Sequence, residues 1–247
     1  MMLSLDIGLL LRIILPPILY ALVLYLTSPY KSLNITTSFH FLLMGVFSMT
    51  TLYFISSIFP SWRTYWELNE PFRKCFLIIA PKEEFAKYLM FLMGMSYYKS
   101  NNKTQHLITY MFYFGMVGLG FALFENLGYV QDYGLDVLKT RTFTTTLLHM
   151  IVGMIFGYWV ALGNIKRSKF KDRSVFGVIC ERRPKLKIRV YSIIGFLFAV
   201  TTHGLWNYNL SNPSESTSTI MISFILAGLM MVKVLANDLN TQKVGDL

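Results

Sequence analysis

The stretch PKEEFAKYL, residues 81–89, lies inside an apolar run that begins near Cys75 and ends near Tyr98. A run of about 20 apolar residues is long enough to span a bilayer as a helix. The ionisable side chains within this one are Lys82, Glu83, Glu84 and Lys87. Each charge near the centre of a membrane helix costs roughly 2.5–3.5 kcal/mol on insertion scales, and such charges usually pair or face a water-filled cavity. The stretch therefore indicates a polar site inside a bundle of membrane helices.

The composition of the whole chain indicates a membrane protein. Of its 247 residues, 54% are hydrophobic and only 15% are charged, and the mean hydropathy is +0.47. Soluble domains carry about 25% charged residues. We therefore expect an all-α, polytopic helical protein of the cell membrane, with residues 1–247 forming a single integral membrane domain.

Apolar runs predict about seven transmembrane helices. Their approximate ranges are 7–26, 37–59, 75–98, 106–130, 143–163, 190–210 and 218–236. No basic segment precedes the first run, which follows Asp6, so we expect a retained helix rather than a cleaved signal peptide.

Much of the positive charge lies in one loop, at residues 164–189. The formal net charge is +10, and ten of the 23 Lys and Arg residues fall between Lys166 and Arg189. A basic loop between two apolar spans is expected on the cytoplasmic side. This orientation puts the N-terminus outside and the C-terminus inside the cell. The expected partners are the lipid bilayer, with anionic lipid at the basic loop, and not nucleic acid.

The two cysteines give no sign of a metal motif or a disulfide. Cys75 and Cys180 are far apart and form no CxxC pair. In the predicted topology they lie on opposite sides of the membrane, so we expect both thiols to be free.

Polar side chains also occur in three later spans: Glu125, His149, and the pair His203 and Asn207. At 1.5 Å rise per residue, Glu84 lies roughly 14 Å and His203 roughly 10 Å from the outer end of its predicted span. Glu125 and His149 lie roughly 8–9 Å from the same side. This common depth predicts one shared site in the outer half of the bundle.

Helical spacing adds detail to that site. Lys87 is four residues after Glu83, so it can neutralise part of the glutamate pair. Adjacent glutamates point about 100° apart on a helix, so one can face the cavity while the other bonds to Lys87 or to a neighbouring helix. The sequence leaves open which glutamate does which.

Two further stripes surround these groups. Phe121 and Tyr129 lie one turn before and after Glu125, on the same helix face. Gly153 and Gly157 follow His149 at four-residue steps, which permits a neighbouring helix to pack closely beside the histidine.

The residue types suit hydrolysis. A glutamate and a histidine can activate water, and the amide of Asn207 can stabilise an oxyanion. Glu125, His149 and His203 are also ordinary zinc ligands, although the sequence contains no HExxH motif. A metal-free glutamate site and a zinc site both remain open at this point.

Three other readings of the same residues remain. Glu83, Glu84 and Lys87 can form a purely structural cluster of ion pairs. Buried Glu and His on several helices are also typical of a proton-coupled transporter. Finally, a membrane partner or immunity protein can keep such a fold without turning over a substrate.

Four short motifs resemble those of the PrsW-type intramembrane proteases. EEFAK resembles their EExxK motif, and FALFENLGY resembles their FxxxE motif. His149 matches their histidine in the next helix, and HGLWN resembles their final histidine motif. The motifs follow one another over residues 75–210, on successive predicted membrane helices. This family is related to the CAAX prenyl endopeptidases and bacteriocin-processing membrane proteases, but Glu125 stands where the prenyl endopeptidases have histidine.

The resemblance implies an intramembrane protease that cuts a single-pass membrane protein, such as an anti-sigma factor, near the outer half of the bilayer. It implies that Glu83 and Glu84 activate water alongside His149 or His203, and that Asn207 assists at the oxyanion. The residues expected to support them are Lys87, Glu125, Phe121 and Tyr129. The resemblance leaves zinc open as a cofactor.

Overall fold

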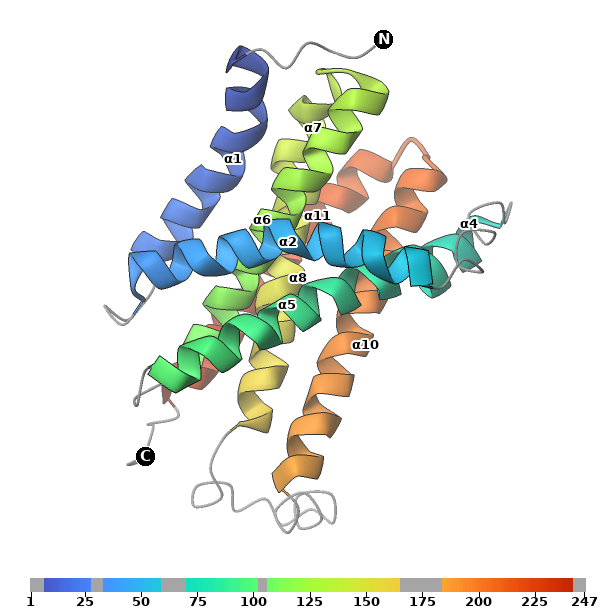
Figure 1. Cartoon of the computed structure of the whole chain (residues 1–247). Coiled ribbons are helices and arrows are strands. Elements are labelled where there is room, and N and C mark those ends of the chain that lie inside the picture. The colour runs from blue at the N-terminus through green and yellow to red at the C-terminus, as the bar shows by residue number, and fades with distance from the viewer. Residues whose placement is uncertain (1–6, 28–32, 59–69, 102–105, 165–183, 242–247) are drawn as a thin grey trace.

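The computed structural model describes residues 7–27, 33–58, 70–101, 106–164 and 184–241 (Figure 1). All regular secondary structure within these ranges is helical. The helices are α1 (Ile7–Leu26), α2 (Ile35–Ile58), α4 (Pro71–Arg73), the π-helical η2 (Lys74–Ile79), α5 (Ala80–Asn101), α6 (Ile108–Tyr133), α7 (Val137–Phe143), α8 (Thr145–Gly163), α10 (Pro184–Ser211) and α11 (Thr217–Thr241).

Every apolar run predicted as a span is helical, which confirms the expected all-α membrane fold. Among the described residues, five helices are long and apolar enough to cross a membrane, and Leu10–Leu26 is a shorter apolar helix. α5 is not one of the five, because its first two turns carry the ionisable residues of the PKEEFAKYL stretch. This helix brings Glu83, Glu84 and Lys87 into the bundle.

Helices α6 and α8 form the centre of the molecule. They pack more extensively against each other than any other pair of elements, and α2 and α10 pack against them from different sides. In Figure 1, α2 and α5 lie across the front of this central pair. The apolar segments of both central helices are 83% buried, against 11% for α11. His149 of α8, which is 1% exposed, is therefore shielded by protein.

Glycines bring α6 and α8 into backbone contact. A Cβ at Gly118 would lie 2.2 Å from the carbonyl oxygen of His149, closer than real Cβ atoms approach. Cβ atoms at Gly153 and Gly157 would lie 2.6 Å and 2.5 Å from carbonyl oxygens of α6. This confirms the predicted close packing beside His149, which fixes the height of that residue against α6.

The segment between the fourth and fifth predicted spans differs from the expected loop at 131–142. α6 continues to Tyr133, and Gly134, with φ of +81°, ends it. A positive φ favours glycine because there is no Cβ to clash. The chain then forms α7, which lies at one end of the bundle (Figure 1) and turns Arg141 inward. A one-dimensional hydropathy reading assigns such a short, partly polar helix to a loop.

Some predictions fall outside the described residues. These are most of the basic loop (165–183), Cys180, Asp6 and parts of the other connections, so the predicted orientation stays a prediction. Cys75 is described, and it is a buried free thiol.

Candidate active site

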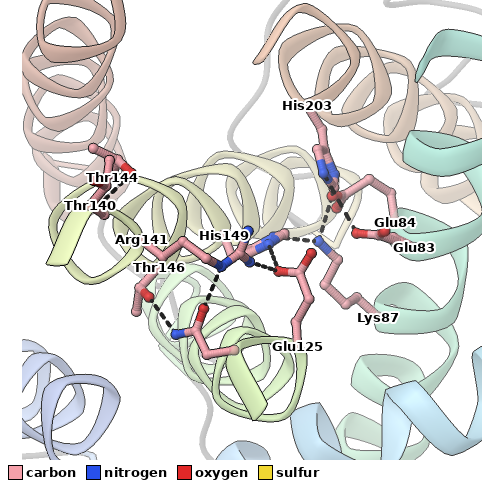
Figure 2. A network of polar contacts seen from close by, with 11 residues as sticks. Glu83, Glu84, Lys87, Glu125, Thr140, Arg141, Thr144, Thr146, His149 and His203 are labelled. Carbon is pink, nitrogen blue, oxygen red and sulfur yellow. Dashed lines mark hydrogen bonds and ion pairs between the residues drawn. The ribbon is translucent and has the colours of Figure 1, made fainter. Parts of the chain in front are cut away.

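The ionisable residues predicted from separate spans meet at one place in the bundle. Figure 2 shows Glu83, Glu84 and Lys87 from α5 facing Glu125 from α6, His149 from α8 and His203 from α10. Each comes from the half of its helix that is nearer the end where α7 lies. The rings of the two histidines are in edge contact, with centroids 5.1 Å apart. The shared depth predicted from the sequence thus corresponds to contact in three dimensions.

Glu84 orients His203. Its Oε1 lies 2.7 Å from His203 Nδ1 and 2.5 Å from Lys87 Nζ. Both the Glu84 and the Lys87 side chains are only 1% exposed, so the carboxylate is balanced by a lysine from its own helix. With Nδ1 donating to Glu84, the other ring nitrogen of His203 is free to act as an acceptor.

Glu125 orients His149 in the same manner. Its Oε2 accepts from His149 Nε2 at 2.9 Å and from Arg141 Nη2 at 2.5 Å. Here the balancing cation comes from α7 rather than from the helix that carries the glutamate. A carboxylate that accepts from one ring nitrogen of a histidine keeps the proton on that nitrogen and fixes the direction of the other one.

Lys87 joins the two carboxylate–histidine pairs. Its Nζ donates to Glu84 and also lies 3.1 Å from His149 Nδ1, and it sits 4.6 Å from the centroid of the Phe121 ring. An ammonium group has donors only, so His149 Nδ1 must accept, and the ring proton must be on Nε2. Lys87 and Arg141 thus only donate hydrogen bonds in this network, and Glu84 and Glu125 only accept them.

Glu83 makes the longest polar contact of this network. Its side chain is 11% exposed, and its Oε2 is buried without a hydrogen-bond partner among the described residues. That oxygen lies 3.6 Å from His203 Nε2, too far for a direct hydrogen bond. With Nδ1 of His203 occupied by Glu84, two acceptor atoms face each other across this gap. A cation at usual ligand distances fits between two acceptors at this separation, and a water molecule contacts both of them from one side.

The same three side chains form a group that can hold a metal ion. Glu83, His149 and His203 each offer one ligand atom, and these atoms lie within 4.8 Å of one another. Two histidines and one carboxylate are a common catalytic zinc set, which leaves a position for water. The residues present therefore fit a metal, and the buried Oε2 of Glu83, which has no hydrogen-bond partner within the described ranges, is a suitable ligand atom. The group differs from the candidates taken from the sequence, because Glu83 occupies the place expected for Glu125.

The remaining predicted residues lie around this centre. Phe121 contacts the edge of His149, with ring centroids 5.1 Å apart, and Tyr129 stacks on the guanidinium of Arg141 at 3.6 Å. Asn207 is half-buried on α10, one turn beyond His203. Within the described ranges, the hydrogen bond found at Asn207 uses its backbone carbonyl, which accepts from the hydroxyl of Ser211.

Three residues of the site, Arg141, Asn126 and Thr146, were not predicted from the sequence. Arg141 Nε donates to Asn126 Oδ1 at 2.8 Å, and Asn126 Nδ2 lies 3.1 Å from Thr146 Oγ1. Asn126 is next to Glu125 in a motif that was already selected, so its position was the available signal. Nothing in the local sequence separates Arg141 from an ordinary basic loop residue.

Comparisons with known proteins agree with the geometry. A family model described as PrsW family intramembrane metalloprotease matches residues 35–236. A curated relative, Protease PrsW of Shouchella clausii (strain KSM-K16), is 25% identical over 158 residues. That match covers 63% of this chain and 63% of the relative, so the chain spans less than two thirds of the relative's length. No solved structure gives a significant match.

Proposed function

This chain belongs to the PrsW family of intramembrane metalloproteases, and from that premise we propose that it hydrolyses a peptide bond in a single-pass membrane protein. The observation that carries the proposal is the gap between Glu83 and His203, where two buried acceptor atoms face each other at 3.6 Å. Water held there is next to a carboxylate with a free oxygen.

We assign the proton transfers to Glu83. As water attacks the carbonyl carbon of the scissile bond, one water proton passes to the Glu83 carboxylate. When the carbon–nitrogen bond breaks, the same carboxyl group returns that proton to the leaving amine. A positioned general base of this kind contributes about 100- to 10,000-fold to the rate.

The neighbouring residues prepare Glu83 for this role. Glu84 holds the ring of His203, and Glu125 holds the ring of His149, so both imidazoles are fixed beside the water. The amide of Asn207, one turn beyond His203, is proposed to donate to the oxyanion. Lys87 pairs with Glu84. It therefore adds positive charge to the site without pairing with Glu83, the proposed proton acceptor.

A metal would be held by Glu83, His149 and His203, and we propose zinc because these ligand types suit it. When bound, zinc supplies a Lewis acid to the centre. A carboxylate that binds through one oxygen keeps the other, so Glu83 retains an oxygen for the proton. On this assignment Glu125 is a partner of His149 and not a ligand.

The substrate is proposed from the position of the site. His203 and Glu125 each lie eight residues before the end of their helices, roughly 12 Å from it at 1.5 Å per residue. A bond at this depth is close to the end of a substrate's own membrane segment, in the outer half if the predicted orientation holds. We therefore propose an anti-sigma-factor-like protein with one membrane span as the substrate class.

The test compares membranes of cells that make the wild type with cells that make Glu83→Gln, an isosteric change. Both proteins are first shown to reach the membrane in equal amount, and new protein N-termini are then read by mass spectrometry. Termini that depend on the wild type and cluster near one end of a transmembrane segment support the proposal. Identical sets of termini, with candidate single-span substrates co-expressed, contradict it.

The metal is tested separately on purified protein. About one equivalent of zinc per chain is expected, and it should be lost in a His149→Ala/His203→Ala variant. Proteolysis that persists unchanged after thorough chelation rejects the metal and leaves the glutamate mechanism in place.

A further inference from the structure

Arg141 is an arginine buried within the site, on a short helix at the end of the bundle. It is 6% exposed, although it lies two residues from Lys139, whose side chain is 82% exposed. Lys139 pairs with Asp136, whose side chain is 90% exposed, so α7 has one solvated face and one face turned toward the site. The Lys139–Asp136 pair shows how an ordinary surface cation of α7 is placed, and it serves as the comparison for Arg141.

The guanidinium of Arg141 is held on three sides. Nη2 pairs with Glu125, Nε donates to Asn126, and the group stacks on the ring of Tyr129 at 3.6 Å. Asn126 is itself tied to Thr146 of α8. Arginine suits this position because its planar fork presents several donors in fixed directions, which lysine does not.

These contacts act on His149 through a single oxygen. Glu125 Oε2 accepts from both Arg141 and His149 Nε2, at 2.5 Å and 2.9 Å. Glu125 is also more exposed than Arg141, at 13% against 7%. Without Arg141, this carboxylate would have water as an alternative partner and would lose its fixed direction toward His149.

We propose that Arg141 is a positioning residue, which fixes the direction of Glu125 so that this carboxylate keeps its hydrogen bond with His149 Nε2 and holds the His149 ring in place at the catalytic centre. The inference rests on the proposed function for the use that the centre makes of His149. It extends the site from the four helices that carry the family motifs to α7 and to the Arg141–Asn126–Thr146 contacts (Figure 2).

A purely structural ion pair makes a different prediction. It would lower stability when broken, but the His149 ring of the folded fraction would remain as it is, since Lys87 still contacts Nδ1. The experiment therefore has to observe the His149 ring itself in folded protein.

The measurement is ¹⁵N NMR of histidine side chains in the full-length protein in lipid. The His149 resonances are assigned as those that disappear in His149→Gln. The wild type should show a protonated Nε2 at the shift of a hydrogen bond to a carboxylate. Arg141→Met should move this signal toward that of a water-exposed imidazole, Arg141→Lys should give an intermediate shift, and Lys139→Met should match the wild type.

A second readout follows metal affinity in the same variants. Changes to residues that orient a metal ligand typically cost 10- to 100-fold in affinity. We expect a loss in that range for Arg141→Met, and no further loss when it is added to Glu125→Gln, because Arg141 acts through that carboxylate. Additive losses would contradict the inference.

The two proposals fail in distinguishable ways. If the wild type binds no metal, the metal assignment fails, while the NMR shift of His149 still decides the role of Arg141. If Arg141→Met folds and its His149 signal equals that of the wild type, the positioning role is wrong whatever the activity. Should Arg141→Met not fold, Arg141→Lys keeps the charge in place and carries the same test.

Discussion

The two carboxylate–histidine pairs of the site have similar geometry but different supports. Glu84 and His203 are sealed in the bundle, and the cation that balances Glu84 is Lys87, three residues further along the same helix. Glu125 and His149 are balanced by Arg141, sixteen residues further along the chain on another helix. The first pair is thus built by local spacing and the second by tertiary packing. Glu83 belongs to neither, and this leaves it available for chemistry.

The largest effect should follow from Glu83→Gln, which tests whether Glu83 stands apart from both pairs. Proteolysis should fall by about 100- to 10,000-fold, the usual contribution of a general base. Thermal unfolding should change little, because the affected oxygen has no partner within the described ranges to lose. The measurement is cleavage of a reporter substrate in proteoliposomes. Glu70→Gln, at an exposed ion pair with Arg73, is the matched control and should retain full activity.

Next is the effect of Glu84→Gln on stability. Removing one partner of a buried ion pair leaves the other charge unpaired, which costs about 3–5 kcal/mol. Lys87 would be that charge, since both side chains are 1% exposed. Unfolding in denaturant should show this loss, and Glu84→Gln/Lys87→Met should recover much of it without recovering activity. Equal stability of Glu83→Gln and Glu84→Gln would remove the distinction between the two glutamates.

Glycine substitutions compare how firmly the two histidines are held. A Cβ at Gly118 meets the backbone carbonyl of His149 at 2.2 Å, whereas a Cβ at Gly204 meets the ring of Phe76 at 2.6 Å. A backbone cannot rotate aside as a ring can, so Gly118→Ala should cost more within the usual overpacking range of about 1–3 kcal/mol.

Both variants are measured by thermal unfolding and by reporter cleavage. Gly128→Ala is the control, because a Cβ there meets nothing within 4 Å and alanine favours the helix. If Gly204→Ala is the more damaging change, His203 is the less tolerant of the two positions.

The smallest effect concerns the aromatic ring beside each cation. Lys87 lies over the buried ring of Phe121 and Arg141 over that of Tyr129, which is 36% exposed. Cation–π contacts contribute about 0.5–1 kcal/mol at exposed sites and about 2 kcal/mol when desolvated. Phe121→Leu should therefore reduce activity more than Tyr129→Leu.

Phe91→Leu provides the packing control for the aromatic comparison, since Phe91 is fully buried and stacks on Phe114 rather than on a cation. It should lower stability and spare activity. Loss of activity equal to that of Phe121→Leu would show that bulk alone explains the effect.

Much of the fold could be predicted from the sequence, for physical reasons. Apolar runs of bilayer length have to be helices, because the backbone must satisfy its own hydrogen bonds in lipid. Gly153 and Gly157 indicated a close helix contact, and four isolated polar groups at one depth indicated a site. These signals depend on spacing along one helix, which a sequence states directly.

The roles of the two glutamates depend on helix phase, which a sequence does not state. η2, the π-helical segment Lys74–Ile79, immediately precedes α5 and packs against α10. A π-helical turn changes the rotation of the helix that comes after it, so a regular 3.6-residue period does not predict which glutamate meets His203. Arg141 was missed for a related reason, because the fold of α7 over the end of the bundle decides where it points.

Each carboxylate that orients a histidine carries its own cation, and this has a consequence for the order of events in the cell. Lys87 and Arg141 compensate Glu84 and Glu125 without any metal, so the helices can insert and assemble while the Glu83 gap is still empty of a cation. On the proposed metal assignment, loading would then be a late maturation step, separate from biogenesis. Chelated protein should accordingly behave as a dormant, correctly assembled precursor that regains activity when the ion is returned.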